Sequence, residues 1–286
     1  MRHAIIPSAA KAEKTTQQLV SIITVTYNSA VTIRETIESV LEQSYDNIQH
    51  IFIDGQSTDN TVEVIEQYRN RYDIPICLIS EPDEGLYDAM NKGVKLATGD
   101  IIGILNSDDI LAHSGVISSV INTLKLPDID ACYGDIEFFE TDHPDKTVRK
   151  WVASMGNYRF GWNPPHPSLY VRKRVYQLIG GYRADLRLAS DYDFMVRAFW
   201  RGNCRATYVP DTWVRMRLGG KSTQGIHSNI AAFREVQQCL RANDVMLPIM
   251  TNSLRLLRKT RQLVGGCAAA QRSPKILSIA EKGMKN

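Results

Sequence analysis

The stretch that decides the fold runs from Asp100 to Asp109 and reads Asp-Ile-Ile-Gly-Ile-Leu-Asn-Ser-Asp-Asp. Its apolar part, residues 101–105, is typical of a short strand buried on both faces. The strand ends in the polar run Asn106, Ser107, Asp108 and Asp109. Two adjacent carboxylates at the end of a buried strand are unfavourable unless a positive charge meets them. They indicate either a divalent cation, Mg²⁺ or Mn²⁺, with oxygen ligands, or a cap for the helix expected near Ser114.

Three β-strand–loop–helix units precede this strand. Apolar and β-branched residues predict strands at 21–26, 48–53 and 76–79, each followed by a polar loop and a helical pattern. Four such units in succession predict an α/β fold with a Rossmann-like, mostly parallel, doubly wound sheet. Loops at the carboxyl ends of parallel strands gather along one edge of the sheet, where a nucleotide is the usual occupant.

The glycine-rich loops that most often hold phosphates are absent from this sequence. No G-x-G-x-x-G follows the first strand, and no G-x-x-x-x-G-K-[ST] occurs anywhere. These absences argue against dehydrogenases and P-loop enzymes. A nucleotide at the predicted edge would be held by carboxylates and a metal ion instead.

Composition indicates a globular protein of a reducing compartment. The 286 residues are 43% hydrophobic and 23% charged, which is ordinary for a globular protein. The five cysteines include no C-x-x-C pair, which argues against a zinc site or a disulfide framework. The chain shows no signal-peptide pattern and no apolar run long enough to span a membrane. We therefore expect a cytoplasmic protein.

Positive charge is concentrated at the C-terminal end. From Arg241 to Asn286 there are nine Lys or Arg residues and two acids, giving +7, whereas the whole chain carries +3. The rest of the chain is therefore mildly acidic, at −4. Within this tail, Leu254–Val264 has the pattern of a basic amphipathic helix that can lie on anionic lipid, or pack on the protein's own body or a second subunit. No nucleic-acid-binding module accompanies the charge, so we expect no nucleic acid partner.

The second half predicts a mixed continuation of the sheet. Residues 130–139 read as a strand, and residues 144–163 read as irregular and aromatic. Three prolines surround His166 and require an extended loop there. A helix is expected from 188 to about 200, with Ser190 or Asp191 at its N-terminus, where the helix dipole favours a carboxylate.

Several short motifs together resemble a known family. In chain order they are Val25–Asn28, Asp54–Thr61, Leu105–Asp109, Gly180–Tyr182, Ala189–Phe194 and Arg217–Ser222. Their order and spacing resemble the family 2 inverting glycosyltransferases with a GT-A fold, in the bacterial exopolysaccharide, colanic-acid and O-antigen branch. The resemblance covers roughly residues 21–223.

The resemblance implies a domain plan and an activity. Residues 1–20 would be a flexible arm, 21–225 a GT-A domain with a nucleotide-binding half (21–110) and an acceptor-binding half (111–225), and 226–286 a helical basic tail. The enzyme would move a sugar, with inversion, from a nucleotide-sugar to a saccharide or lipid-linked acceptor during surface polysaccharide synthesis. The expected donor is a UDP-sugar and the expected cofactor Mn²⁺ or Mg²⁺. The tail is a candidate for peripheral contact with the cytoplasmic face of the inner membrane.

The resemblance also assigns roles to residues. Asp54 would accept a hydrogen bond from the nucleobase, and Asp191 would be the catalytic base. Asp108 would hold the metal as the second acid of a D-x-D motif, whose first acid is here Asn106. The other expected nucleotide contacts are Thr26, Tyr27, Asn28, Asp83, Asn91, Asn106 and Ser107. Candidate acceptor or diphosphate contacts are Asp109, His166, Arg217 and Lys221.

Most of these residues also have a structural interpretation. Asp191 could instead cap its helix, and Asp54 could form a turn before Gly55, although the functional role is favoured for both. His166 is as well suited to tying down its loop. Asp193 is expected to pair with Arg197 at i+4. Trp162 and Tyr158 could stack on acceptor sugar rings, but packing in the core or on the surface is the default expectation.

Two other functions fit the fold. A sugar-nucleotide nucleotidyltransferase would carry a Gly-rich, Arg/Lys-containing loop after its first strand, and Tyr27–Ala30 is not such a loop. A non-catalytic nucleotide-binding or scaffold protein would have no need of Asp191.

Overall fold

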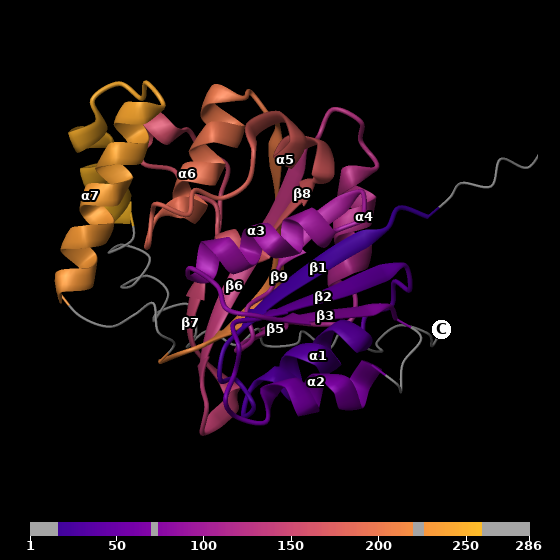
Figure 1. Cartoon of the computed structure of the whole chain (residues 1–286). Helices are drawn as coiled ribbons and strands as arrows, with labels where there is room; N and C mark the ends of the chain where they lie inside the picture. The colour runs from indigo at the N-terminus through magenta and orange to yellow at the C-terminus, as the bar shows by residue number, and fades with distance from the viewer. Residues whose placement is uncertain (1–16, 70–73, 220–225, 259–286) are drawn as a thin grey trace, which may run out of the picture.

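A nine-stranded mixed sheet forms the centre of the computed structural model, which describes residues 17–69, 74–219 and 226–258 (Figure 1). The strand order is β3-β2-β1-β4-β8-β6-β9-β5, with β7 added beside β6. The strands are β1 Val20–Thr26, β2 Ile48–Asp54, β3 Ile76–Ser80, β4 Ile101–Ile104, β5 Asp109–Leu111, β6 Ala131–Glu140, β7 His143–Trp151, β8 Leu169–Arg172 and β9 Ala206–Arg217. The helices are α1 Ile33–Leu41, α2 Thr61–Arg69, α3 Leu86–Leu96, α4 Val116–Leu124, α5 Lys173–Ile179, α6 Ser190–Val196 and α7 Ile226–Ala242.

The first four strands form the parallel part of the sheet. β1 pairs in parallel with both β2 and β4, and β2 pairs in parallel with β3. The register sets Thr26 beside Asp54 and Asp54 beside Ser80, so these strands end at one level. Figure 1 shows α3 on one face of this part and α1 with α2 on the other. The predicted doubly wound arrangement is confirmed, and it brings the loops that follow these strands to one edge.

The other half of the sheet is mixed. β8 runs antiparallel to both β4 and β6, whereas β6 and β9 are parallel. The predicted strand at 130–139 is confirmed by β6. The prediction that residue 144 onward is irregular was wrong as far as Trp151, because β7 pairs antiparallel with β6. This outer strand is mostly polar, exposed over its first four residues and half-buried over the rest, so it lacks the alternation that reveals a strand with one buried face.

The acid pair does not cap a helix. α4 begins after Gly115, and no side chain caps it. Asp109 instead starts the short strand β5, which pairs antiparallel with β9. The capping alternative for Asp108 and Asp109 is therefore excluded.

The C-terminal helices pack on the body of the protein. α7 and the helical residues 248–258 lie beside α6, which continues into a π-helical turn at Arg197–Arg201. Buried residues of this segment, Val236 and Leu240 among them, share one apolar cluster with Phe194 of α6. Across the described ranges, no helix combines the length and apolar character that a membrane crossing requires.

Candidate active site

Asp54 is buried at the end of β2 and organises the loop that follows. Its Oδ2 accepts hydrogen bonds from the Ser57 backbone N–H (2.9 Å) and the Ser80 hydroxyl (2.6 Å), and its Oδ1 accepts one from the Ser57 hydroxyl. A buried carboxylate needs such donors, because burial without them is strongly unfavourable. Asp54 thus joins the ends of β2 and β3, as the turn interpretation requires, while Oδ1, which accepts one hydrogen bond, retains further acceptor capacity.

The loops after β1, β2 and β4 are joined directly. Asn28, at a φ of 51°, accepts a hydrogen bond from the Thr58 backbone N–H at 2.8 Å. The backbone N–H of Asn28 donates to the Ser57 hydroxyl, also at 2.8 Å. The hydroxyls of Ser29 and Ser107 lie 2.9 Å apart. Together with residues 81–85 after β3, residues 27–29, 55–59 and 105–109 are called the strand-end loops below.

Gly55 permits a close approach between two of these loops. A Cβ at this position would lie 2.5 Å from Asp83 Oδ2 and 3.6 Å from Tyr27 Cδ2, so a larger residue would displace the Asp83 carboxylate. Asp83 also accepts a hydrogen bond from the Gly85 backbone N–H at 2.9 Å. Close by, Thr26 Oγ1 is buried and has no hydrogen-bond partner among the described residues. The structure therefore brings Thr26, Tyr27, Asn28, Asp54 and Asp83 together, as the sequence predicted.

The two adjacent acids after β4 point in different directions. Asp109 is buried and accepts a hydrogen bond from Asn106 Nδ2 at 3.0 Å. Burial, together with the neighbouring charge of Asp108, raises the pKa of Asp109 to about 8. Asp108 is only partly buried, and desolvation raises its pKa as well. Asp109 therefore holds the loop through its buried hydrogen bond with Asn106, whereas the partly exposed carboxylate of Asp108 is accessible to a ligand.

Arg217, at the end of β9, supplies the positive charge near this pair. Its charge lowers the pKa of both acids, whereas burial raises both pKa values by a larger amount. The guanidinium donates to Glu35 at 2.7 Å and lies 4.8 Å from the centre of the Phe139 ring. Arg217 is thus held by Glu35 and the Phe139 ring beside the strand-end loops.

Asp191 lies in the first turn of α6 and does not cap it. The cap position is Ala189, with no side-chain cap. Asp191 Oδ1 instead accepts a hydrogen bond from the Tyr87 hydroxyl at 3.1 Å. No described residue donates a hydrogen bond to Oδ2. Because Tyr87 is on α3, directly after the third strand-end loop, Asp191 is linked to the edge where these loops gather.

Four ring side chains, Tyr87, His166, Tyr176 and Tyr182, form an aromatic wall beside Asp191. Tyr87 stacks on Tyr182 with ring centres 5.9 Å apart. The Tyr182 hydroxyl lies 3.0 Å from His166 Nε2 and 3.1 Å from the Tyr176 hydroxyl. Burial lowers the pKa of His166, with Asp191 acting in the opposite direction. His166 therefore ties its loop to Tyr182, as its structural interpretation requires.

A family profile described as "Glycosyl transferase family 2" matches residues 21–187, more than half of the chain. The chain belongs to glycosyl transferase family 2. An uncharacterised glycosyltransferase of Mycobacterium tuberculosis is 30% identical over 200 residues, spanning 64% of this chain and 70% of the relative. A PGL/p-HBAD biosynthesis glycosyltransferase of Mycobacterium bovis is 29% identical over 182 residues, spanning 63% of this chain and 69% of the relative.

Solved structures share the fold of this glycosyltransferase. Residues 1–349 of S. aureus TarS in complex with UDP align with a TM-score of 0.59 at 17% identity, over 86% of this chain and 72% of that TarS chain. The mannosyltransferase PcManGT from Pyrobaculum calidifontis, in complex with GDP-Man and Mn²⁺, aligns with a TM-score of 0.59 at 18% identity, over 90% of this chain and 78% of that enzyme. The expected GT-A fold is thereby confirmed.

The side chains near Asp108 fit a metal ion only in part. Within the described ranges, no group of three or more His, Cys, Asp or Glu residues is arranged to hold a metal ion. Asn106, in the place of the first acid, donates its amide to Asp109. Of the two adjacent acids, the partly exposed Asp108 carboxylate is therefore the one available as a ligand. This donor set suits a Mg²⁺ or Mn²⁺ ion that takes most of its ligands from phosphates and water.

Two residues that sequence reasoning missed hold the Asp191 region from the C-terminal side. The Glu235 carboxylate on α7 accepts hydrogen bonds from three consecutive backbone N–H groups, at Arg187 (3.1 Å), Leu188 (2.8 Å) and Ala189 (2.9 Å). The Arg255 guanidinium lies 5.3 Å from the centre of the Tyr192 ring. Neither residue belongs to a motif, because only the fold brings it to α6.

Most of the remaining residues that the sequence singled out have structural roles. Both amide atoms of Asn91 bond the Tyr182 backbone at 2.8 Å, so Asn91 shapes the turn at Gly181 and is left out of the proposed nucleotide site. Lys221 lies outside the described residues. The predicted pairing of Asp193 with Arg197 is confirmed at 2.6 Å. Trp162 and Tyr158 are buried, which confirms packing in the core and not on the surface.

Proposed function

We propose that this family 2 glycosyltransferase transfers a sugar, with inversion, from a nucleotide-sugar to a hydroxyl of a saccharide or lipid-linked acceptor. The observation that carries the proposal is the hydrogen bond from Tyr87 to Asp191. It joins the proposed catalytic base to the helix that follows a strand-end loop. A base in that position stands beside a nucleotide-sugar held by those loops.

In this proposal the strand-end loops bind a nucleoside diphosphate sugar, with a UDP-sugar favoured. Asp54 would accept a hydrogen bond from the nucleobase, Tyr27 would pack on the base, and Asp83 would face its edge. Asn28, Asn106 and Ser107 would contact the ribose and diphosphate. The TarS complexes with UDP and UDP-GlcNAc, and the PcManGT complex with GDP-Man, support this class of donor on the same fold.

The reaction would be a single displacement. Asp191 takes the proton from the acceptor hydroxyl, and the acceptor oxygen forms a bond to the anomeric carbon from the side opposite the diphosphate. The bond from that carbon to the diphosphate oxygen breaks, and its electron pair leaves with the nucleoside diphosphate. Attack from the opposite side inverts the configuration.

Asp108 would hold the divalent ion. When bound, Mn²⁺ or Mg²⁺ supplies positive charge for the departing diphosphate. Arg217, whose charge acts on both acids, adds to that charge from the protein side. His166 and the rest of the aromatic wall would line the path of the acceptor.

The proposed setting is surface polysaccharide assembly of the exopolysaccharide type, at the cytoplasmic face of the inner membrane. A lipid-linked acceptor would be presented at that surface. The basic C-terminal segment from Leu254 to Val264 would contact anionic lipid there.

A nucleotide panel tests the donor site. Thermal unfolding is followed with UDP, GDP, dTDP and CMP, each with Mn²⁺ and with a chelator. We expect UDP with Mn²⁺ to raise the Tm most, because ligands that bind only the folded state stabilise it. If no nucleotide changes the Tm, the proposed nucleotide site is refuted. If the Tm rises equally with Mn²⁺ and with the chelator, the metal ion has no part in binding.

A further inference from the structure

The helix at residues 248–258 has its polarity inverted. Ile249, Met250 and Leu256 are 62%, 48% and 40% exposed, and they lie on one side of the helix. Thr251 and Asn252, on the opposite side, are fully buried. A helix on the surface of a globular protein normally buries its apolar stripe and exposes its polar one. The outer side of this helix is therefore suited to an apolar neighbour.

The buried polar side chains are paired, which fixes the helix in this orientation. Thr251 Oγ1 donates to the Arg159 carbonyl at 3.3 Å, and Asn252 Nδ2 donates to the Phe233 carbonyl at 3.0 Å. Arg255 Nε donates to Asn252 Oδ1 at 3.1 Å. Turning the helix to bury Ile249 would leave these groups without their partners, so the exposed apolar side is built into the packing.

The turn before the helix extends the apolar side. Met246 and Leu247 are 64% and 62% exposed. Leu247 has a φ of 52°, a left-handed conformation that is uncommon for a residue with a side chain. These five residues, Met246, Leu247, Ile249, Met250 and Leu256, are called the apolar tip below.

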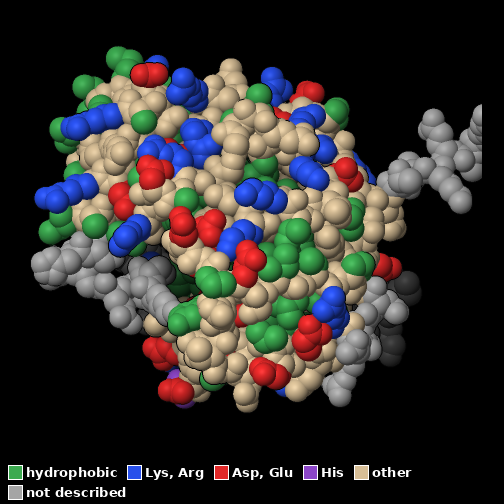
Figure 2. Space-filling model, viewed as in Figure 1, with side chains coloured by type: hydrophobic (Ala, Val, Ile, Leu, Met, Phe, Trp, Pro, Cys, Tyr) green, Lys and Arg blue, Asp and Glu red, His purple; other side chains and the backbone are tan. Residues whose placement is uncertain are grey.

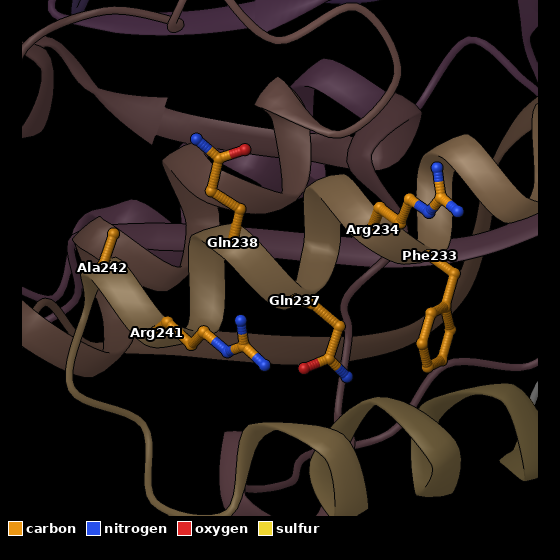
Figure 3. Close-up of a pocket in the computed structure, with 6 residues that line it drawn as sticks. All are labelled: Phe233, Arg234, Gln237, Gln238, Arg241 and Ala242. Carbon is orange, nitrogen blue, oxygen red and sulfur yellow. The ribbon is translucent and has the colours of Figure 1, made fainter.

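Arginines surround the apolar tip. α7 carries Arg234 and Arg241, which line a cavity of about 690 Å³, and Figure 3 shows Arg241 and Gln237 directed toward the neighbouring helix. Arg258 is exposed at the end of residues 248–258, and the sequence continues with Lys259 and Arg261. In Figure 2, hydrophobic and basic side chains lie next to one another in the region where Figure 1 places α7. An apolar surface with a cationic border is suited to a membrane carrying anionic lipid.

We propose that the apolar tip inserts into the headgroup region of an anionic lipid bilayer, while Arg234, Arg241 and Arg258 contact lipid phosphates. The inner side of the same helix places Arg255 over Tyr192, the residue after Asp191. Docking in this way brings the membrane surface close to the proposed base. The inference builds on the proposed lipid-linked acceptor and names the surface that reaches it.

Vesicle co-sedimentation of the full-length protein tests the proposal. Vesicles of 70% phosphatidylcholine and 30% phosphatidylglycerol are compared with pure phosphatidylcholine. The Ile249→Glu/Met250→Glu variant is expected to bind the anionic vesicles at least tenfold more weakly than the native protein. Leu126→Glu/Leu178→Glu is the matched control, because these leucines are also exposed but lie after α4 and on α5. The control should bind as the native protein does.

A second variant tests the cationic border without altering the apolar tip. Arg241→Gln/Arg258→Gln should lose most of the preference for anionic over neutral vesicles. UDP binding is measured in parallel for every variant. Unchanged UDP affinity shows that the fold is intact, and it keeps failure of lipid binding distinct from failure of the proposed activity.

Three results would overturn the proposal. One is native-like vesicle binding by the Ile249→Glu/Met250→Glu variant. Another is equal binding of the native protein to neutral and anionic vesicles. The third is that the native protein binds neither kind of vesicle and sediments as a dimer in analytical ultracentrifugation, whereas this variant sediments as a monomer. A second copy of the chain would then cover the apolar tip.

Discussion

The strand-end loops and the region around Asp191 are built in different ways. Neighbouring loops are joined by short hydroxyl, amide and carboxylate hydrogen bonds, such as Asn28 to Thr58 and Ser80 to Asp54. Asp191 is instead positioned by groups from distant parts of the chain, from Tyr87 on α3 to Glu235 on α7. The first site depends on local sequence and the second on the completed fold. A substitution in one region should therefore weaken either donor binding or sugar transfer and leave the other close to its native value.

The largest expected effect is on turnover. Asp191→Asn removes the proposed base, and we expect transfer to fall roughly 1,000-fold, within the range for general base catalysis. UDP affinity should stay within about twofold of the native value, because the strand-end loops are untouched. Sugar transfer and calorimetric titration with UDP measure the two quantities.

Asp185→Asn is the matched control for that change. Asp185 lies in the loop before α6, is largely exposed and pairs with Arg183. Its substitution should leave transfer near the native rate. Near-native transfer by Asp191→Asn would show that another group is the base.

The converse change weakens the donor side. Asp54→Asn replaces a buried carboxylate that accepts three hydrogen bonds, and each such bond to a charged group contributes about 1.5–3 kcal/mol. We expect the Kd for UDP to rise about 10- to 100-fold, with kcat at saturating donor reduced less. Ser80→Ala removes one of these bonds and should give a smaller change in the same direction. A lower Tm with unchanged Kd would limit Asp54 to its structural role.

A buried histidine gives the donor side its own pH dependence. His50 is fully buried in β2, with Nε2 2.9 Å from Thr24 Oγ1, and burial lowers its pKa to about 3. The unfolded chain takes up this proton near pH 6.5. The free energy of unfolding should therefore fall as pH drops from about 6.5 to about 3, by up to about 1.4 kcal/mol per pH unit.

Chemical denaturation at a series of pH values measures this dependence. The His50→Leu variant should lose the part of the pH dependence of unfolding free energy that His50 contributes. The His113→Asn variant retains His50 and should show the same pH dependence as the native protein. A slope that survives in His50→Leu would assign the acid sensitivity to other groups.

The smallest effect is expected at the link between the two regions. Tyr87→Phe removes the hydrogen bond to Asp191 and keeps the ring that stacks on Tyr182. We expect kcat to fall about fivefold to tenfold, consistent with about 1 kcal/mol for one hydrogen bond, with UDP affinity unchanged. Tyr45→Phe is the control, because its hydroxyl donates to Gln18 instead. Equal rates in the two variants would show that the Tyr87 hydroxyl does not help position Asp191.

Sequence alone predicted the parallel units, because each repeats a buried strand, a polar loop and a helical pattern at short range. It also predicted the pairing of Asp193 with Arg197, one helical turn apart. It missed β7, which has no buried alternating face, and Glu235, whose backbone partners lie more than forty residues away. The resemblance assigned Asn91 to the nucleotide, yet its hydrogen bonds go to Tyr182, which lies 91 residues away in the chain.

The three backbone hydrogen bonds that Glu235 accepts have a consequence for how the acceptor could change. The segment leading into Asp191 is held by a helix that forms no part of the strand-end loops. Substitutions on α7 can therefore shift that segment while the sugar source is recognised as before. If Asp191 is the base, as proposed, changes in the C-terminal helices would alter the acceptor without rebuilding the nucleotide side.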